Sequence, residues 1–147
     1  MTSEKVRTLA RTLLDPGEEL LAVVPASNQS LGMSAGNVST SNPCAAYLRH
    51  NGIVEQGFAG AALFSYWALT PHRLVALAGT MWSSKPKKVA VAVPRAGLRV
   101  WWADQDRTTR LLHVLPADSY DTVRMTPRDA DGDAFLAALG EQAQQLA

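Results

Sequence analysis

The chain has 147 residues, a length that predicts one domain with its own hydrophobic core. Its 14 lysines and arginines nearly balance 13 acidic residues, so the net charge of +1 gives no bulk field that would attract nucleic acid or an anionic membrane. The one cysteine excludes an intramolecular disulfide and a cysteine-rich zinc site. Charges near the N-terminus interrupt the apolar core that a secretion signal needs, and no apolar run reaches the ~20 residues of a membrane span. We therefore expect a cytoplasmic protein without a transmembrane segment.

The first predicted elements are a helix and a strand. Apolar residues recur at helical spacing over residues 6–14, Ser3 can cap the start, and Asp-Pro-Gly at 15–17 ends the helix. The segment EELLAVVPA, residues 18–26, has the composition of a strand and ends near Pro25, because proline lacks a backbone donor.

Residues 27–60 differ in character from the rest of the chain. Their first half is rich in serine, asparagine and glycine and has neither the helical nor the strand period, and the second half is mixed. A connection of this length is unusual inside one domain. We therefore interpret 27–60 as a long loop or insertion within a single domain that spans residues 1–147.

Beyond this segment, apolar runs recur at regular intervals and are separated by turn residues. With the strand at 19–25 they predict about seven strands, the others lying at 61–69, 73–79, 88–93, 98–104, 108–115 and 120–126. A final helix is predicted from an apolar stripe, and Asp129 or Asp131 can cap its start; the stripe comprises Phe135, Leu136, Leu139, Ala143 and Leu146. Strands in series followed by one helix predict an α+β, mainly β fold, in which a partly open antiparallel barrel is closed at one end by the helix.

Three stretches resemble the bacterial pleckstrin-homology-like domains. LLDPGEELLAVV is similar to the family's opening, WALTPHRLVAL to its hairpin, and KKVAVAVPRAGLRVWW to the following strand pair. The resemblance covers nearly the whole chain outside 27–60 and implies a pleckstrin-homology-like barrel with a short N-terminal helix and a C-terminal capping helix. The chain departs from the family pattern in the turn at Pro71 and His72 and in the long insertion. Because Arg49 is the only fixed cation in 26–60, the lipid binding of eukaryotic members is not carried over.

The sequence contains two groups of residues with reactive side chains. Cys44 with His50 could form a nucleophile and base, but no cysteine-enzyme signature surrounds them. His50, His72 and His113 could ligate a metal, but their spacing places no two of them on one helical turn or hairpin. We therefore expect neither a catalytic residue nor a metal site.

Two further groups of residues are candidates for binding. An anion could be held by the basic residues around the run at 88–93, although lysines at strand ends also discourage edge-to-edge aggregation; these residues are Lys85, Lys87, Lys88 and Arg95. An interface could form on a face rich in tryptophan, comprising Trp82, Arg99, Trp101 and Trp102. The strand period sends Trp101 and Trp102 to opposite faces, so one belongs to the core and the other is covered by a helix, a loop or a partner.

These observations favour a non-enzymatic interaction module without a cofactor. It would bind an unknown protein partner or copies of itself, through exposed sheet edges and the tryptophan face. The alternative is an anionic ligand or lipid headgroup bound by the basic loop at 85–95, which is the one route to peripheral membrane contact. A weaker alternative is an enzyme that uses Cys44.

Overall fold

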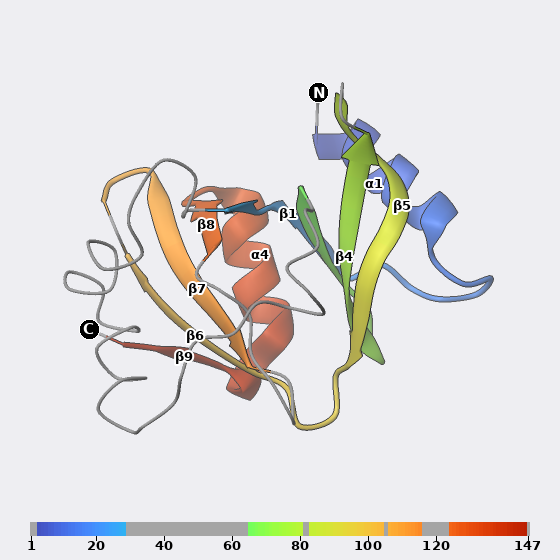
Figure 1. The fold of residues 1–147 in the computed structure, drawn as a ribbon. Coiled ribbons are helices and arrows are strands. Elements are labelled where there is room, and N and C mark those ends of the chain that lie inside the picture. The colour runs from blue at the N-terminus through green and yellow to red at the C-terminus, as the bar shows by residue number, and fades with distance from the viewer. Residues whose placement is uncertain (1–2, 29–64, 81–82, 105, 116–123, 147) are drawn as a thin grey trace.

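The computed structural model describes residues 3–28, 65–80, 83–104, 106–115 and 124–146, and over these residues the chain is mainly β with two helices (Figure 1). One sheet has four strands in the order β1-β3-β4-β5, and the other has five in the order β2-β8-β7-β6-β9. The elements in chain order are α1 (Ser3–Leu13), β1 (Ala22–Pro25), β2 (Ser27–Asn28), β3 (Tyr66–Leu69), β4 (Arg73–Thr80), β5 (Ser83–Pro94), β6 (Arg99–Asp104), β7 (Thr109–Leu115), β8 (Arg124–Pro127), α4 (Ala130–Leu139), the 3-10 turn η2 (Gly140–Gln142) and β9 (Ala143–Gln145).

The predicted mainly β class, with a helix before the strands and a helix after them, is confirmed. The described strands form two open sheets, in which every pair is antiparallel except the parallel pair of β6 and β9. β1 pairs with β3 in the first sheet and β2 pairs with β8 in the second, so residues 22–28 pass from one sheet to the other. Neither described helix is long and apolar enough to cross a membrane.

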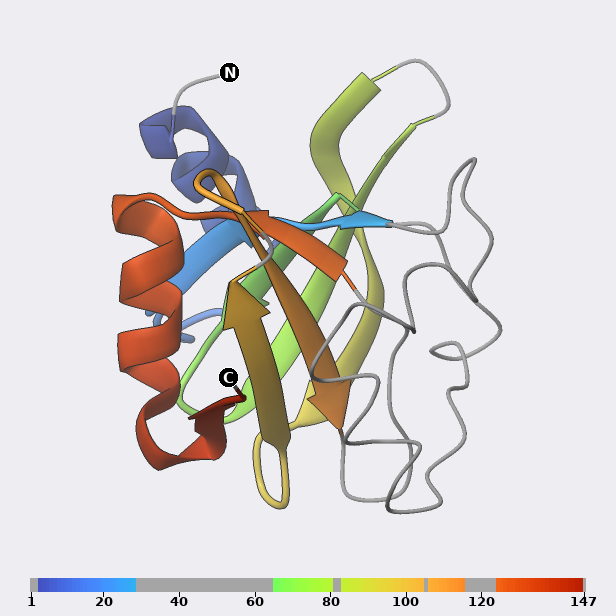
Figure 2. The same ribbon diagram turned by 90° about the vertical axis from the view of Figure 1, so that its left-hand side faces the viewer.

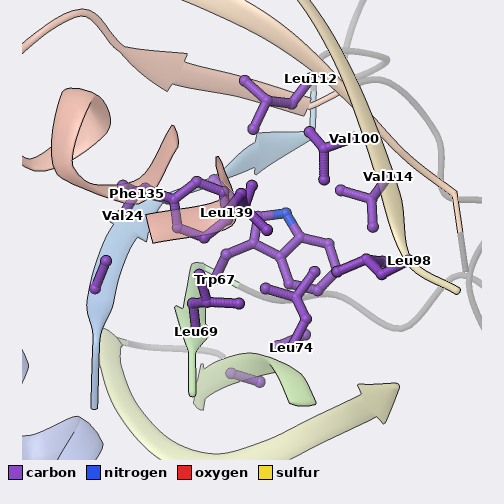
Figure 3. Packing of buried hydrophobic residues seen from close by; sticks show 14 residues of the cluster. Val24, Trp67, Leu69, Leu74, Leu98, Val100, Leu112, Val114, Phe135 and Leu139 are labelled. Carbon is purple, nitrogen blue, oxygen red and sulfur yellow. The ribbon is translucent and has the colours of Figure 1, made fainter. Parts of the chain in front are cut away.

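The main core lies between the two sheets and α4. The fully buried Trp67 indole sits near its centre, surrounded by side chains from both sheets and by Phe135 and Leu139 of α4 (Figure 3). α4 runs along one side of the sheets, where its buried face joins them in one cluster (Figure 2). Burial of large side chains of this kind contributes roughly 2 kcal/mol each, so this core is the main source of stability.

The two central strands of the four-stranded sheet, β3 and β4, are buried on both faces. Leu74 and Ala76 point into the main core, whereas Val75 and Leu77 point the other way, beneath the apolar face of α1. The helical spacing of Val6 and Ala10 places their side chains on that face of α1, and Leu14, directly after the helix, joins the same cluster. A strand that is buried on both faces needs apolar residues at nearly every position, and this explains the near-continuous apolar composition of β4.

The Thr-Pro-His-Arg segment between β3 and β4 is a hairpin turn, as its sequence predicts. Leu69 pairs with Leu74, and the Thr70 backbone N–H donates to the Arg73 carbonyl at 3.0 Å. The Thr70 hydroxyl oxygen accepts from the backbone N–H groups of His72 and Arg73 at 3.2 and 3.0 Å. This pattern satisfies the turn's own donors and leaves Thr70 buried without cost.

The end of the chain differs from the prediction. α4 is capped by Asp129, whose Oδ1 accepts from the Gly132 N–H at 2.9 Å, but the helix stops at Leu139. Gly140 has φ of 60°, which ends the helix, and Ala143 and Leu146 then lie on or beside a strand and not on a helical stripe. The predicted helix up to residue 146 is therefore wrong beyond residue 139.

Candidate interaction site

The four cations predicted to hold an anion are divided between two places. Lys87 and Lys88 are exposed and Lys85 is half-buried, all on the first part of β5. Arg95 follows the other end of that strand, and the seven positions between it and Lys88 correspond to roughly 20 Å of extended chain. Adjacent lysines also point to opposite faces of a strand. The structure therefore does not bring the four side chains to one point.

Arg95 contributes to the structure of the domain. Its Nε donates to the Gln142 side-chain oxygen and its Nη2 to the Ala138 carbonyl, both at 2.7 Å, and its Nη1 donates to the Thr70 carbonyl at 3.3 Å. Gln142 in turn donates to the carbonyls of Arg95 and Leu98. These bonds tie the end of α4 to the hairpin turn and to the connection before β6, and one of them supplies a donor to the Ala138 carbonyl in the last turn of α4.

The residues predicted to form one tryptophan face lie on two faces of the sheet, because side chains alternate along β6. Trp102 points toward the main core, half-buried, with the Arg110 guanidinium carbon 5.1 Å from its ring centroid. Trp101 points to the opposite face of the sheet and is 5% exposed, with Arg99 5.4 Å from its ring centroid. The expectation that the two indoles lie on opposite faces is confirmed. Trp82, the fourth residue predicted for this face, lies outside the described residues.

Trp101 belongs to a small apolar cluster on the outer face of the five-stranded sheet. The cluster contains Ala103 and Leu115, which are also buried, and Leu146 packs against it. We call these residues the Trp101 cluster. β9, which ends one residue before Leu146, adds to the edge of β6 in parallel register, with Val100 opposite Ala143 and Trp102 opposite Gln145. Nothing in the sequence indicated this strand, because Gln-Ala-Gln-Gln-Leu-Ala has the composition of a helix.

A second candidate surface, besides the edge of β6, is the outer edge of β5 in the four-stranded sheet. It has 12 residues, and in the described part of the chain it pairs on one side only, with β4. The Arg95 N–H points to the His72 carbonyl beside β4. Because backbone groups alternate along a strand, those of Pro94 and Ala92 point away from β4. A bulge at Ala90 interrupts the ladder between Val89 and Val91.

The ionisable groups with shifted pKa values have structural explanations. Bidentate hydrogen bonds of 2.8 Å from Arg73 lower the pKa of Glu18 to about 2, and the Glu18 side chain is 8% exposed. Burial in the core lowers the pKa of His113 to about 4. The Glu18–Arg73 pair joins the turn after α1 to the β3–β4 hairpin, a contact over 55 positions that no local pattern reveals.

The residues considered for catalysis and metal binding do not assemble within the described part of the chain. His113 is fully buried in β7, whereas His72 is exposed in the hairpin turn. Cys44 and His50 lie outside the described residues, as do residues 29–60 of the predicted insertion. Among the residues that the structure describes, no group of three or more His, Cys, Asp or Glu side chains is placed to hold a metal ion.

A cavity of about 90 Å³ opens beside α1 and the start of α4. It is lined by Ser3, Val6, Val23, Pro25, Tyr66, Asp129 and Asp131. Its carboxylates already have partners, because Asp131 binds Arg7 at 2.6 Å and Asp129 caps α4. A space of this size holds a few water molecules, so the cavity does not define a ligand.

The chain was compared with protein-family models, curated proteins and solved structures. Nothing matches it.

Proposed function

We propose that the chain is a pleckstrin-homology-like domain that acts as a non-enzymatic interaction module and associates with a second copy along β5. The family assignment is supported by the element order, which is a helix, two open sheets and a helix that packs against both. It is also supported by the transfer of the chain from one sheet to the other over residues 22–28, since this joins the sheets at one corner.

The observation that carries the proposal is the outer edge of β5. Ala92 is exposed, and its backbone N–H and C=O point away from β4, so a second strand can pair there. Val91 and Val93 beside it pack against the main core and hold this part of β5 in place. The lysines and Pro86 earlier in the strand, and the bulge at Ala90, disfavour pairing over the first half of β5. Association is thereby confined to the second half.

Charge favours an antiparallel pair of β5 strands. The first half of β5 carries Lys87 and Lys88, while Pro94 at the far end pairs with Arg73 of β4. Around Arg73 lie Asp15, which is 79% exposed, and the Glu18 carboxylate. In an antiparallel pair, the lysines of each copy approach the end of the other copy that carries the exposed Asp15 carboxylate. With a net charge of +1 per chain, no strong overall repulsion opposes this contact.

A non-enzymatic role agrees with the structural positions of Glu18 and His113, the two groups whose pKa values are strongly shifted. Strongly shifted pKa values are the usual mark of catalytic residues. Here Glu18 is held by Arg73 in an ion pair between two turns, and His113 is enclosed in the core. Each shift follows from a contact that stabilises the fold.

Light scattering of the whole chain over a concentration series tests the proposal. We expect a mass twice that of one chain, decreasing with dilution and with added salt. Ala92→Pro removes an outward N–H without breaking a bond to β4, as natural Pro94 does, and should raise the dimer dissociation constant about tenfold or more. Ala92→Ser keeps the N–H and should dimerise like the natural chain. A natural chain that stays monomeric at millimolar concentration would refute the proposal.

A further inference from the structure

We propose that the edge of β6 is a binding site for an extended segment of a partner protein, and that the chain's own β9 occupies this site until the partner displaces it. This inference rests on the proposed function in one respect only, that the domain binds by strand addition. It concerns the other sheet and a different edge from the self-association along β5.

β9 shows what the site accepts. The segment lies parallel to β6, and the Leu146 N–H donates to the Trp102 carbonyl at 2.8 Å. Side chains alternate between the faces of the sheet, so Ala143 packs against the main core and Leu146 packs against the Trp101 cluster. Gln144 and Gln145 are exposed. The ligand is therefore an extended segment with a small residue, two polar residues and then an aliphatic residue.

β9 can leave without disturbing the sheet beneath it. It pairs with β6 over three residues, whereas β6 pairs with β7 over six. The Gln142 side chain is bonded to the carbonyls of Arg95 and Leu98, which holds the turn before β9. The hinge is therefore placed at Ala143, and α4 keeps its contacts when the strand moves.

Departure of β9 uncovers groups that suit a protein interface. The Trp102 carbonyl loses its donor, and the Trp101 cluster loses the Leu146 side chain. Arg99 already lies over the Trp101 ring, and tryptophan and arginine are both enriched among the residues that contribute most to binding in protein interfaces. The predicted role of Arg99 and Trp101 in an interface is thus compatible with the burial of Trp101 in the isolated chain.

The attached β9 competes with any partner. A segment joined through a short connection acts at an effective concentration in the millimolar range. The natural chain should consequently bind a free segment weakly, and a change that releases β9 should raise the affinity without changing the site itself. A higher affinity for the free segment after release of β9 is therefore what distinguishes a site that the chain itself occupies.

The test uses the full chain and a fluorescein-labelled peptide with the sequence of residues 140–147. Leu146→Glu places a charge against the Trp101 cluster and should release β9, so the variant should bind the peptide about tenfold or more tightly than the natural chain in fluorescence anisotropy. Gln145→Glu puts the same charge on an exposed neighbour and should behave like the natural chain. A peptide with glutamate in place of leucine should not bind.

Equal peptide binding by the Leu146→Glu and natural chains, or no binding by either, would overturn the proposal. So would a natural dimer that dissociates on Leu146→Glu, because the site would then belong to a second copy. If the variant does not fold, hydrogen exchange of the natural chain decides: the Leu146 amide should exchange about 100-fold or more faster than the Val114 amide in β7, and equal rates would overturn the proposal. The peptide-binding and hydrogen-exchange results do not depend on pairing at Ala92, so the two proposals fail separately.

Discussion

Gly132 shows how one residue determines where a helix docks. The glycine lies in the first turn of α4 and is buried against the end of β8. A Cβ at this position would lie 2.4 Å from the Pro127 carbonyl oxygen and 3.3 Å from Nη1 of Arg110. Because the nearest atom belongs to the backbone, it cannot move aside as the tip of a side chain would. The close approach of α4 to β8 therefore requires glycine.

Gly132→Ala should destabilise the chain, although alanine is the better helix former. Helix propensity alone predicts a gain of up to about 1 kcal/mol, whereas the overlap with Pro127 predicts a loss of about 1–3 kcal/mol in the free energy of unfolding. The two effects have opposite signs, so urea unfolding separates them. A variant as stable as the natural chain, or more stable, would contradict the steric explanation.

Single residues were predictable where their surroundings are local. The opposite orientations of Trp101 and Trp102 follow from the strand period, and the Thr70 turn follows from its own hydroxyl and backbone. The partners of Arg95 and Glu18 were not predictable, because those of Arg95 lie 25 to 47 positions away along the chain and that of Glu18 lies 55 positions away. The sequence alone therefore predicts that Arg95 binds an anion, whereas its partners in the structure are a helix end, a turn carbonyl and a glutamine.

At the scale of elements, the end of α4 is where sequence period and structure diverge. The spacing of Phe135, Leu139, Ala143 and Leu146 fits a helical stripe, and the residues between them favour a helix. Gly140 stops the helix, and the β6 edge offers a backbone ladder that residues after it can join. A local sequence pattern cannot reveal pairing with β6, because β6 lies some 40 positions earlier in the chain. The one sequence signal for the end of the helix was Gly140, because glycine commonly follows the last residue of a helix.

The attachment of the α4 end to the rest of the domain should depend on Arg95. Arg95→Gln removes the donors to the Ala138 and Thr70 carbonyls, so we expect a loss of about 2 kcal/mol in the free energy of unfolding. Lys88→Gln removes an exposed cation from β5, the strand before Arg95, and should change stability by less than about 0.5 kcal/mol. Urea unfolding of both variants provides the comparison. Equal stabilities would show that Arg95 does not hold the helix end.

At the scale of the whole molecule, the two apolar clusters on either face of the four-stranded sheet explain why the class was predictable. The apolar runs of β3 and β4 contribute side chains to the main core on one face of the sheet and to the cluster beneath α1 on the other face. The pairing of β1 with β3 across the long segment between them is non-local, and no short pattern fixes it. The order of strands in each sheet therefore had to come from the structure.

Acid should destabilise the molecule in two separate ranges of pH. His113 has a pKa near 6.5 in the unfolded chain and about 4 in the core, so only the unfolded chain takes up this proton between those values. The free energy of unfolding should fall by about 3 kcal/mol as the pH falls from 7 to 4. The Glu18 carboxylate, with a pKa of about 2 against an ordinary 4.5, should add a second loss as the pH falls from about 4.5 to 2.

Urea unfolding at a series of pH values, with one variant for each group, assigns the two losses. His113→Gln keeps hydrogen-bonding atoms but does not titrate, so it should remove the slope between pH 6.5 and 4.5 and retain the slope at lower pH. Glu18→Gln should do the reverse, with Glu19→Gln as its exposed neighbouring control. The reason for the separation is physical: burial excludes the charged form of His113, whereas Arg73 favours the charged form of Glu18. A natural chain with constant stability from pH 7 to 5 would contradict the burial of a neutral histidine.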